Sequence, residues 1–260
     1  MQHDTIAAMA KKIVVANWKM NPPSFREAKK LFEAEKKAAA ALARRVTVVI
    51  APPALYLRAL ASLVRGASTA FAAQNVHWES AGAFTGEMSC LQARDAKAAY
   101  ALVGHAERRA AGETNDDARK KVAACLGAGL TPVLCIGEAA RNAEGAHFDY
   151  VREQLRIGTA DVPQGKVGKL IVAYEPVWAI GAAAAMKPRD MHEMAIFIRK
   201  VLAEAHGEGA LSVTILYGGA VDSTNAAAML EEGDVDGLLV GRASIEAERF
   251  RILLNAVAER

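Results

Sequence analysis

Residues 171–181 of the chain read IVAYEPVWAIG, an apolar run that ends in one carboxylate and then a proline. The β-branched start is typical of a buried parallel strand, and Glu175 falls where such a strand opens into a loop. Pro176 restricts the residue before it, so we expect Glu175 to be held extended at the exit of the strand. A carboxylate in that place is a candidate general base, although a solvated loop acid gives the same local pattern.

The same arrangement, an apolar run followed by a polar or glycine-rich tail, recurs along the whole chain. We expect eight strands, at residues 12–17, 46–51, 69–73, 100–104, 131–137, 170–174, 213–217 and 235–240. Helical patterns lie between them, at residues 24–45, 56–64, near 93, 115–126, 148–157, 190–206, 224–231 and 245–258. Strands that alternate with helices in this way predict a (β/α)8 barrel of the α/β class. A doubly wound open sheet is the alternative, but the GxGxxG turn that usually follows its first strand is absent.

The length and the uniform composition of the chain indicate one domain. A chain of 260 residues fits one such barrel, and no linker, charge block or shift of composition divides it. We therefore expect a single domain at residues 10–260. Residues 1–9 lack the continuous apolar core of a secretory signal, and we expect them to form a disordered extension, in which Met9 could be the original start.

Composition excludes several classes of protein. Apolar residues make up 52% of the chain, but no uninterrupted run reaches the ~18 residues of a membrane span. The formal net charge of +3, from 32 basic and 29 acidic residues, does not favour nucleic-acid binding and would suit a small anionic substrate. Cys90, Cys125 and Cys135 are odd in number and too far apart for a CxxC motif. They favour buried free thiols in a reducing compartment, and so a cytoplasmic protein, over a disulfide framework or a metal site.

Three residues at strand ends form a candidate catalytic set. In a barrel, residues that follow different strands converge on one mouth, however far apart they are in the sequence. Lys19 follows the first strand, His105 the fourth, and Glu175 ends the sixth. Each alone has an ordinary explanation, as a surface charge, a structural histidine or a loop acid. Together they combine a cation, a proton-transfer group and a carboxylate base, which suits proton abstraction beside a carbonyl with an enediolate stabilised by fixed donors.

Candidate anion-binding loops follow the seventh and eighth strands. Residues 217–220 (YGGA) and 241–244 (GRAS) occupy places where barrels commonly bind phosphate through backbone N–H groups and a helix N-terminus. Tight turns would also explain either glycine-bearing segment, but two of them at adjacent strand ends favour a phosphate site. The candidate donors, including one from the loop after the sixth strand, are Gly181, Ala220, Gly241 and Arg242.

Several motifs closely resemble those of the triosephosphate isomerase family. They are residues 17–21 (NWKMN), 103–109 (VGHAERR), 135–138 (CIGE), 174–181 (YEPVWAIG) and 217–219 (YGG). They occur in order and at the family's spacing, and the resemblance covers about residues 10–260. It implies a barrel that interconverts dihydroxyacetone phosphate and D-glyceraldehyde 3-phosphate, in glycolysis and gluconeogenesis, with no cofactor and no metal.

The resemblance also implies a role for each site residue. Glu175 would be the base that moves a proton between C1 and C2, and His105 the neutral electrophile that acts on the carbonyl and hydroxyl oxygens. Lys19 would stabilise the phosphate and the developing enediolate, and Asn17 would add a hydrogen bond at the same end. Glu107 would be a supporting acid near Lys19, without contact with the substrate.

Two loops carry further implied roles. Residues 176–186 would form the lid that closes on the phosphate, excludes water and suppresses phosphate elimination. Tyr217 would support the site from behind. Residues 82–87 (GAFTGE) resemble the family's dimer loop, with Thr85 reaching Asn17 of the second subunit. We therefore expect a homodimer, or a tetramer, with no nucleic-acid or membrane partner.

The chain departs from the family pattern at several places near the site. Ala106 and Ala220 stand where the family has serine, and Arg242 stands where it has the second glycine of a pair. A positive φ at Arg242 would cost roughly 1 kcal/mol or more, whereas with a negative φ its N–H group still serves. Ala182–Ala185 replace a Thr-Gly-Lys sequence and a flexible hinge. Because alanine favours helix by up to about 1 kcal/mol per residue over glycine, we expect catalysis with an impaired lid.

Two rival functions remain open on the sequence. One is a different phosphate-binding barrel, such as an aldolase or a ribose-phosphate isomerase, but a Schiff-base aldolase needs a buried lysine inside a strand and Lys19 follows its strand. The other is a barrel that binds triose phosphate, or a partner, without turnover. The substitutions near the site favour this second rival, and the intact Lys19, His105 and Glu175 oppose it.

Overall fold

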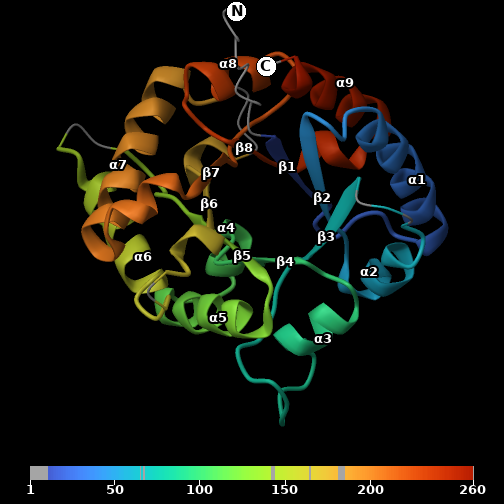
Figure 1. Cartoon of the computed structure of the whole chain (residues 1–260), viewed down its shortest axis with the longest axis horizontal. Helices are drawn as coiled ribbons and strands as arrows, with labels where there is room; N and C mark the ends of the chain where they lie inside the picture. The colour runs from blue at the N-terminus through green and yellow to red at the C-terminus, as the bar shows by residue number, and fades with distance from the viewer. Residues whose placement is uncertain are drawn as a thin grey trace, which may run out of the picture.

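The strands of the computed structural model, which describes residues 11–64, 66, 68–141, 144–163, 165–180 and 185–259, form one closed parallel barrel. They pair in chain order, from β1 to β8 and back to β1 (Figure 1). They are β1 (Lys12–Asn17), β2 (Val46–Ala51), β3 (Thr69–Ala73), β4 (Tyr100–Val103), β5 (Thr131–Ile136), β6 (Ile171–Tyr174), β7 (Thr214–Tyr217) and β8 (Gly237–Val240). The predicted (β/α)8 barrel is therefore confirmed.

Helices surround the barrel and form the outer ring seen in Figure 1. The α-helices are α1 (Phe25–Ala41), α2 (Ala54–Ala61), α3 (Cys90–Asp95), α4 (Ala106–Ala110), α5 (Asn115–Ala128), α6 (Ala146–Gly158), α7 (Pro188–His206), α8 (Ala226–Glu231) and α9 (Ala247–Ala258). Short 3₁₀ helices lie in the connections: η1 (Val167–Lys169), η2 (Val177–Ala179), η3 (Glu208–Ser212) and η4 (Arg242–Ile245). Helix α4 is an addition to the predicted set, and it begins directly after His105.

Local capping explains where several helices begin and end. Ser24 accepts a hydrogen bond from the Glu27 backbone N–H at 3.3 Å, which confirms the predicted N-cap of α1. That helix ends at Ala41, earlier than predicted, and residues 42–45 form turns instead. Helix α5 ends at Gly129, whose φ of 78° lies in the left-handed region that glycine adopts at low cost.

Alternate residues of the strands face two separate cores. The cluster inside the barrel consists of Ile13, Val15, Val49, Ala51, Ala72, Leu102, Val133, Cys135, Ile171, Ala173, Leu216 and Leu239. The strand residues between them, such as Val14 and Ala16 of β1, belong to the cluster that packs against the helices. The barrel is thus a filled core and not a pore, so a site can form only at its mouths.

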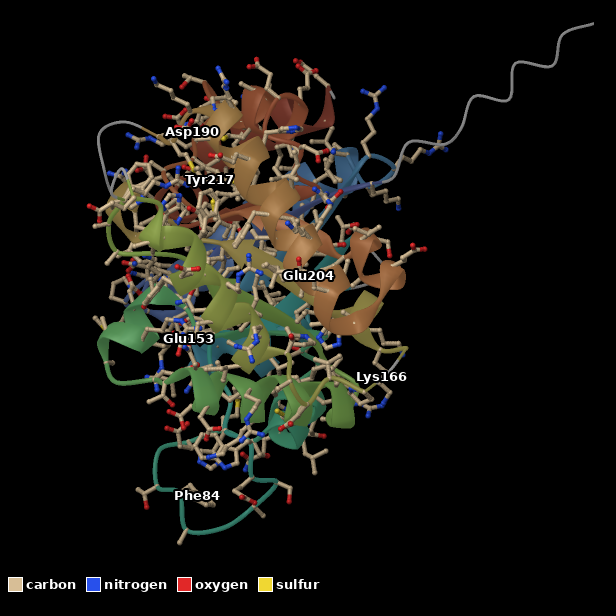
Figure 2. The ribbon with its side chains drawn as sticks, turned by 90° about the vertical axis from the view of Figure 1, so that its left-hand side faces the viewer. Phe84, Glu153, Lys166, Asp190, Glu204 and Tyr217 are labelled. Carbon is tan, nitrogen blue, oxygen red and sulfur yellow. The ribbon has the colours of Figure 1, made fainter. Side chains whose placement is uncertain are left out.

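One loop leaves the compact outline of the barrel. It connects β3 to α3, and Figure 2 shows Phe84 in the part that projects farthest. Residues 82–87, the predicted dimer loop, belong to this projection. The predicted extension at residues 1–9 lies outside the described residues. Among the helices that the structure describes, none combines the length and the hydrophobicity needed to cross a bilayer.

Candidate active site

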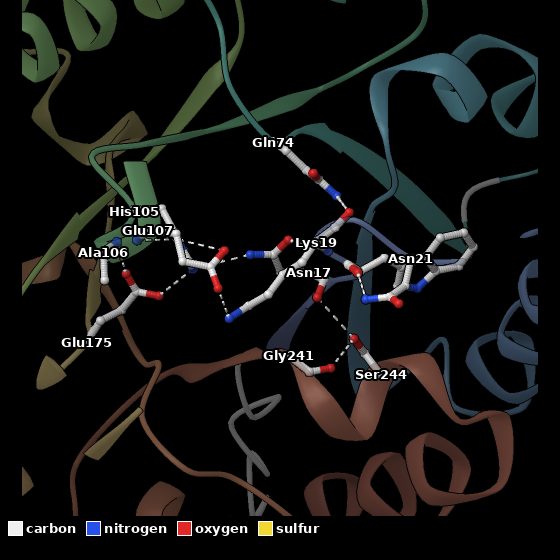
Figure 3. A network of polar contacts seen from close by, with 11 residues as sticks. Asn17, Lys19, Asn21, Gln74, His105, Ala106, Glu107, Glu175, Gly241 and Ser244 are labelled. Atoms are coloured by element: carbon white, nitrogen blue, oxygen red, sulfur yellow. Dashed lines mark hydrogen bonds and ion pairs between the residues drawn. The ribbon is translucent and has the colours of Figure 1, made fainter. Parts of the chain in front are cut away.

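Asn17, Lys19, His105 and Glu175 lie together at the carboxyl ends of β1, β4 and β6, as predicted (Figure 3). They line a cavity of about 310 Å³, whose far wall is residues 218–221. A larger cavity of about 690 Å³ lies at the opposite end of the barrel, among lysines and threonines near the strand starts. We assign the site to the smaller cavity, because there a buried carboxylate, a histidine and a lysine meet.

Glu175 follows β6 with its carboxylate inside the mouth. The residue is 3% exposed, its Oε1 lies 3.2 Å from His105 Nε2, and its Oε2 accepts a hydrogen bond from the Ala106 N–H at 3.2 Å. A Cβ at Gly218 would lie 2.8 Å from Glu175 Cγ, and one at Gly137 would lie 2.0 Å from its carbonyl oxygen. Both places therefore require glycine. At position 106 the family's hydroxyl is missing, but the backbone N–H still binds the carboxylate.

The hydrogen bonds around His105 locate its proton. His105 Nδ1 accepts from the Glu107 backbone N–H at 3.2 Å, at the start of α4, so Nδ1 carries no hydrogen. In a neutral ring the hydrogen must then be on Nε2, which lies 3.2 Å from Glu175 Oε1 and 3.3 Å from Asn17 Nδ2. Because Asn17 Nδ2 is itself a donor, the Nε2–H group donates to the carboxylate. This assignment supports the neutral electrophile that the family resemblance implies.

Lys19 has an unusual backbone that two hydrogen bonds hold in place. Its φ is 54°, a left-handed value that is uncommon for a residue with a long side chain. Asn17 Oδ1 accepts from the Lys19 N–H at 3.1 Å, which fixes the amide orientation used above. Gln74 Nε2 donates to the Lys19 carbonyl at 2.8 Å. The Lys19 ammonium forms an ion pair with Glu107 at 2.7 Å, so it lies within the mouth and is not a free surface charge.

The candidate phosphate loops follow β7 and β8 on the other side of the cavity. The backbone N–H groups of Ala220 and Gly241 make no hydrogen bond to any described residue, so they are available to an anion. A Cβ at Gly219 would lie 2.3 Å from the Tyr217 hydroxyl, so this turn requires glycine. Arg242 begins η4 and is not among the described residues with a positive φ. The strain considered for Arg242 therefore does not arise.

The first residues of the lid are tied to Glu138, which follows β5. Glu138 is 2% exposed and accepts hydrogen bonds from the Tyr174 hydroxyl at 2.8 Å and from Trp178 Nε1 at 2.9 Å. Arg141 donates to the same carboxylate and to the Tyr174 hydroxyl, both at 2.9 Å. Burial, and then the charge of Glu138, raise the pKa of Tyr174, so it stays a neutral phenol. The entrance of the lid is therefore held by the buried carboxylate of Glu138, which binds the more exposed side chains of Arg141 and Trp178.

The far end of the lid is held by Tyr217. Its hydroxyl accepts a hydrogen bond from the Met186 N–H at 3.2 Å, and both residues are buried. Ala185, the last residue of the alanine run, packs against the hydrophobic core. Gly181 and Ala182–Ala184 lie outside the described residues. The phosphate contact of Gly181 and the effect of the alanine run therefore stay predictions.

Thr85 lies away from this cavity, on the projecting loop. It lines a different hollow with His77, Trp78 and Phe84, and the His77 ring lies 4.2 Å from each of the other two rings. Within one chain the predicted dimer-loop residue is thus not brought to the site. In the parts of the chain that the structure describes, no group of three or more His, Cys, Asp or Glu side chains could hold a metal ion.

Sequence reasoning missed three supporting contacts at this site. These are the bond from Gln74 to Lys19, the pairing of Glu138 with the lid, and the N–H group of Ala106. A signal existed for the first two, because Gln74 follows the third strand and Glu138 follows the fifth. The strand-end position that selected Lys19 would also have selected them.

Comparison with known proteins points to one family. A family model described as triosephosphate isomerase matches residues 12–257. A curated relative, a triosephosphate isomerase of Endomicrobium trichonymphae, is 38% identical over 249 residues, which cover 95% of this chain and 99% of the relative. The family model thus spans the eight strands and every residue placed at the cavity.

Proposed function

The chain belongs to the triosephosphate isomerase family, and from this premise we propose that it interconverts dihydroxyacetone phosphate and D-glyceraldehyde 3-phosphate, a step of glycolysis and gluconeogenesis. The observation that carries the proposal is the buried contact of Glu175 Oε1 with His105 Nε2, 3.2 Å apart in the cavity that Lys19 also lines. The reaction moves a proton and causes no net oxidation or reduction, so the proposal includes no cofactor.

Glu175 is proposed to act as the base. It takes the proton from the carbon beside the carbonyl, and the electrons of the broken C–H bond form the C=C bond of an enediolate. Negative charge then collects on the former carbonyl oxygen, where the Nε2–H group of His105 and the ammonium of Lys19 stabilise it. The former carbonyl oxygen gains a proton from His105 Nε2, and the former hydroxyl oxygen gives its proton to the same nitrogen and becomes the new carbonyl oxygen, while Glu175 returns the first proton to the neighbouring carbon. The substrate leaves as the other isomer.

The substrate must first replace contacts that these groups make in the free protein. One Glu175 oxygen faces His105, the other is held by the Ala106 N–H, and Lys19 is paired with Glu107. We infer that the Nε2–H group and the ammonium turn to the substrate oxygens and leave the carboxylate free to reach carbon. The side chain of Glu107 is 59% exposed, so its ion pair with Lys19 is weak enough to exchange.

The phosphate is proposed to bind at the opposite wall of the cavity. Backbone N–H groups of Gly181, Ala220, Gly241 and Arg242 would donate to it, with Lys19 and Asn17 at the boundary with the reacting carbons. A bound phosphate would favour closure of the lid over it, which excludes water from the enediolate. Tyr217 supports this arrangement by holding the end of the lid at Met186.

We also propose that the chain assembles as a homodimer, or a tetramer, in the cytoplasm. Met20 is 92% exposed, Leu55 is 89% exposed and Phe84 is 43% exposed, and they follow β1, β2 and β3. Since these strands are neighbours and Phe84 lies on the loop that projects after the third, we infer that the three exposed apolar side chains belong to one interface. A second subunit there would place its Thr85 against Asn17. The free, buried cysteines suit a reducing compartment.

A Schiff-base aldolase fits the structure less well. Lys12 is the one lysine inside the eight described strands, and it begins β1 at the opposite end of the barrel from the site cavity. Lys19 lies beyond the end of its strand and is paired with Glu107. The site thus offers a carboxylate base and no buried lysine nucleophile.

A coupled assay on glyceraldehyde 3-phosphate tests the proposal. Glu175→Gln removes the base, and Glu193→Gln makes the same change on the exposed face of α7 as a matched control. We expect Glu175→Gln to lower kcat by about 100-fold or more and the control to leave it unchanged. If the unmodified chain shows no turnover above Glu175→Gln but binds a phosphorylated enediolate mimic tightly, the barrel binds without catalysis.

A further inference from the structure

A second hollow lies beside the phosphate end of the site. It has a volume of about 410 Å³, and it shares the wall formed by Ala220, Val221 and Arg242 with the site cavity. The rest of its lining comes from residues 222–225, which connect β7 to α8, from Arg249 and Ile252 of α9, and from Ala185 and Ala243. The proposed isomerisation gives this hollow no role. A molecule bound by one end at the phosphate loops would have its other end next to it.

Two arginines make this hollow positive. Arg242 begins η4 and Arg249 lies on α9, and Arg249 also pairs with the exposed Glu246 at 2.9 Å. Asp222 is the one acidic residue of its described lining, which leaves an excess of one positive charge. The Asp222 carboxylate is engaged within its own loop, because it accepts from the Thr224 N–H at 2.8 Å and from the Thr224 hydroxyl at 2.6 Å. These bonds, and less strongly the charge of Arg242, lower the pKa of Asp222.

The wall between the two hollows is braced before any ligand binds. Asn225 Nδ2 donates to the Ala220 carbonyl at 3.0 Å, and Asn225 Oδ1 accepts from the Asp222 N–H at 3.1 Å. A preformed anion pocket loses less conformational entropy on binding than a mobile one. Arg242 stands where the family pattern has glycine, so this chain places a guanidinium at a point that the pattern leaves uncharged.

We propose that Arg242 and Arg249 form an accessory anion subsite for the second phosphoryl group of a small bisphosphorylated compound. Its first phosphoryl group occupies the phosphate loops, so this inference rests on the proposed function. Guanidinium groups bind phosphate oxygens through two parallel N–H donors, more strongly than neutral donors do. A compound that occupies both places competes with triose phosphate and inhibits the isomerase, whereas a monophosphate of the same length gains nothing from the second hollow.

Matched pairs of synthetic ligands test the subsite. Propane-1,3-diol and butane-1,4-diol bisphosphates are compared with propyl and butyl phosphate, by titration calorimetry and as inhibitors of the coupled assay. We expect each bisphosphate to bind at least about tenfold more tightly than its monophosphate. Arg249→Gln should remove most of this advantage and leave kcat and monophosphate binding unchanged, because Arg249 lines only the second of the two hollows.

Two further variants complete the design. Arg242→Gly restores the family residue and should also lower the ratio of bisphosphate to monophosphate affinity. Arg251→Gln, on the exposed face of α9 where Arg251 pairs with Glu248, should leave the ratio unchanged. Equal binding of the two ligand types to the unmodified chain, or a ratio that Arg249→Gln does not alter, overturns the subsite. Failure of the isomerase proposal is distinguishable, because it abolishes turnover while calorimetry still measures the ratio.

Discussion

The chemical half of the site and its phosphate half are built in different ways. Asn17, Lys19, His105 and Glu175 meet at one place, where the Asn17 amide oxygen binds the Lys19 N–H and the His105 Nε2–H group faces the Glu175 carboxylate. The phosphate half is proposed to act through backbone N–H groups, such as that of Ala220. Apart from the alanine run of the lid, the family departures fall where a backbone N–H group is the donor, proposed at Ala220 and Arg242 and present at Ala106, whose N–H binds the Glu175 carboxylate. We therefore expect a side chain to be replaceable where a peptide N–H group makes the contact, and to be required where the side chain itself carries the proton.

The strongest test of this contrast is a change in the chemical half that keeps a donor of similar size and removes the group that can transfer a proton. We expect His105→Gln to lower kcat by about 100-fold or more, because an amide can donate a hydrogen bond to the enediolate oxygen but cannot exchange a proton with it. Ala220→Ser, in the phosphate half, should change kcat by no more than about fivefold, because one surface hydrogen bond is worth about 1 kcal/mol or less. The coupled assay on both variants measures the contrast, and comparable losses would remove it.

The first residues of the lid, like the chemical half, are held by side-chain bonds, which here converge on Glu138. Glu138→Gln removes the charge that faces Arg141 and one acceptor for the Tyr174 and Trp178 donors. We expect the free energy of unfolding to fall by about 1–3 kcal/mol, as measured by urea denaturation. Glu153→Gln, on the exposed face of α6, is the matched control. Equal stability of the two variants would show that the network adds little.

The alanine run should have a smaller effect on kcat than His105→Gln, through the motion of the lid. Replacing Ala182–Ala184 with Thr-Gly-Lys restores the family's flexible sequence, and we expect kcat to rise by up to about fivefold. The reason is that alanine favours helical backbone, which opposes the hinge motion of the lid. Steady-state kinetics on the two chains decides the point. Equal kcat values would mean that the alanine run does not limit the lid.

Glu35, which binds the Trp18 side chain, should make the free energy of unfolding depend on pH. Glu35 is fully buried, its Oε1 accepts from Trp18 Nε1 at 3.2 Å, and burial raises its pKa well above 4.5. Above pH 4.5 the folded state therefore holds a proton that the unfolded state has lost, so the free energy of unfolding falls as pH rises. Glu35→Gln removes this contribution. Urea unfolding at pH 5 and pH 8 should show a smaller fall for the variant, and parallel falls would contradict the assignment.

The sequence alone predicted the barrel because each strand repeats one signal. A β-branched run that ends in polar residues identifies both the strand and its carboxyl end, so the convergence of Lys19, His105 and Glu175 followed from the fold. Helix ends were less certain, because the turn at residues 42–45 has no glycine or proline to mark it. Helix α4 is too short for a periodic pattern.

The supporting contacts were harder to predict for a physical reason. Whether Gln74 reaches the Lys19 carbonyl, or Glu138 reaches Trp178, depends on side-chain directions and distances between strands that are far apart in the chain. The proton on His105 Nε2 likewise follows from a single backbone contact at Nδ1. A sequence indicates which strand ends lie together, whereas these bonds depend on the distances between the side chains at those ends.

The central claim is that Glu175 moves a proton through an enediolate. Conversion of dihydroxyacetone phosphate in D₂O tests it most directly, because a proton held on a carboxyl group at the enediolate stage exchanges with solvent. We predict solvent deuterium at C2 of the glyceraldehyde 3-phosphate formed, at a rate that Glu175→Gln lowers by about 100-fold or more. Turnover that incorporates no deuterium, or incorporation at the same rate in Glu175→Gln, would contradict the account.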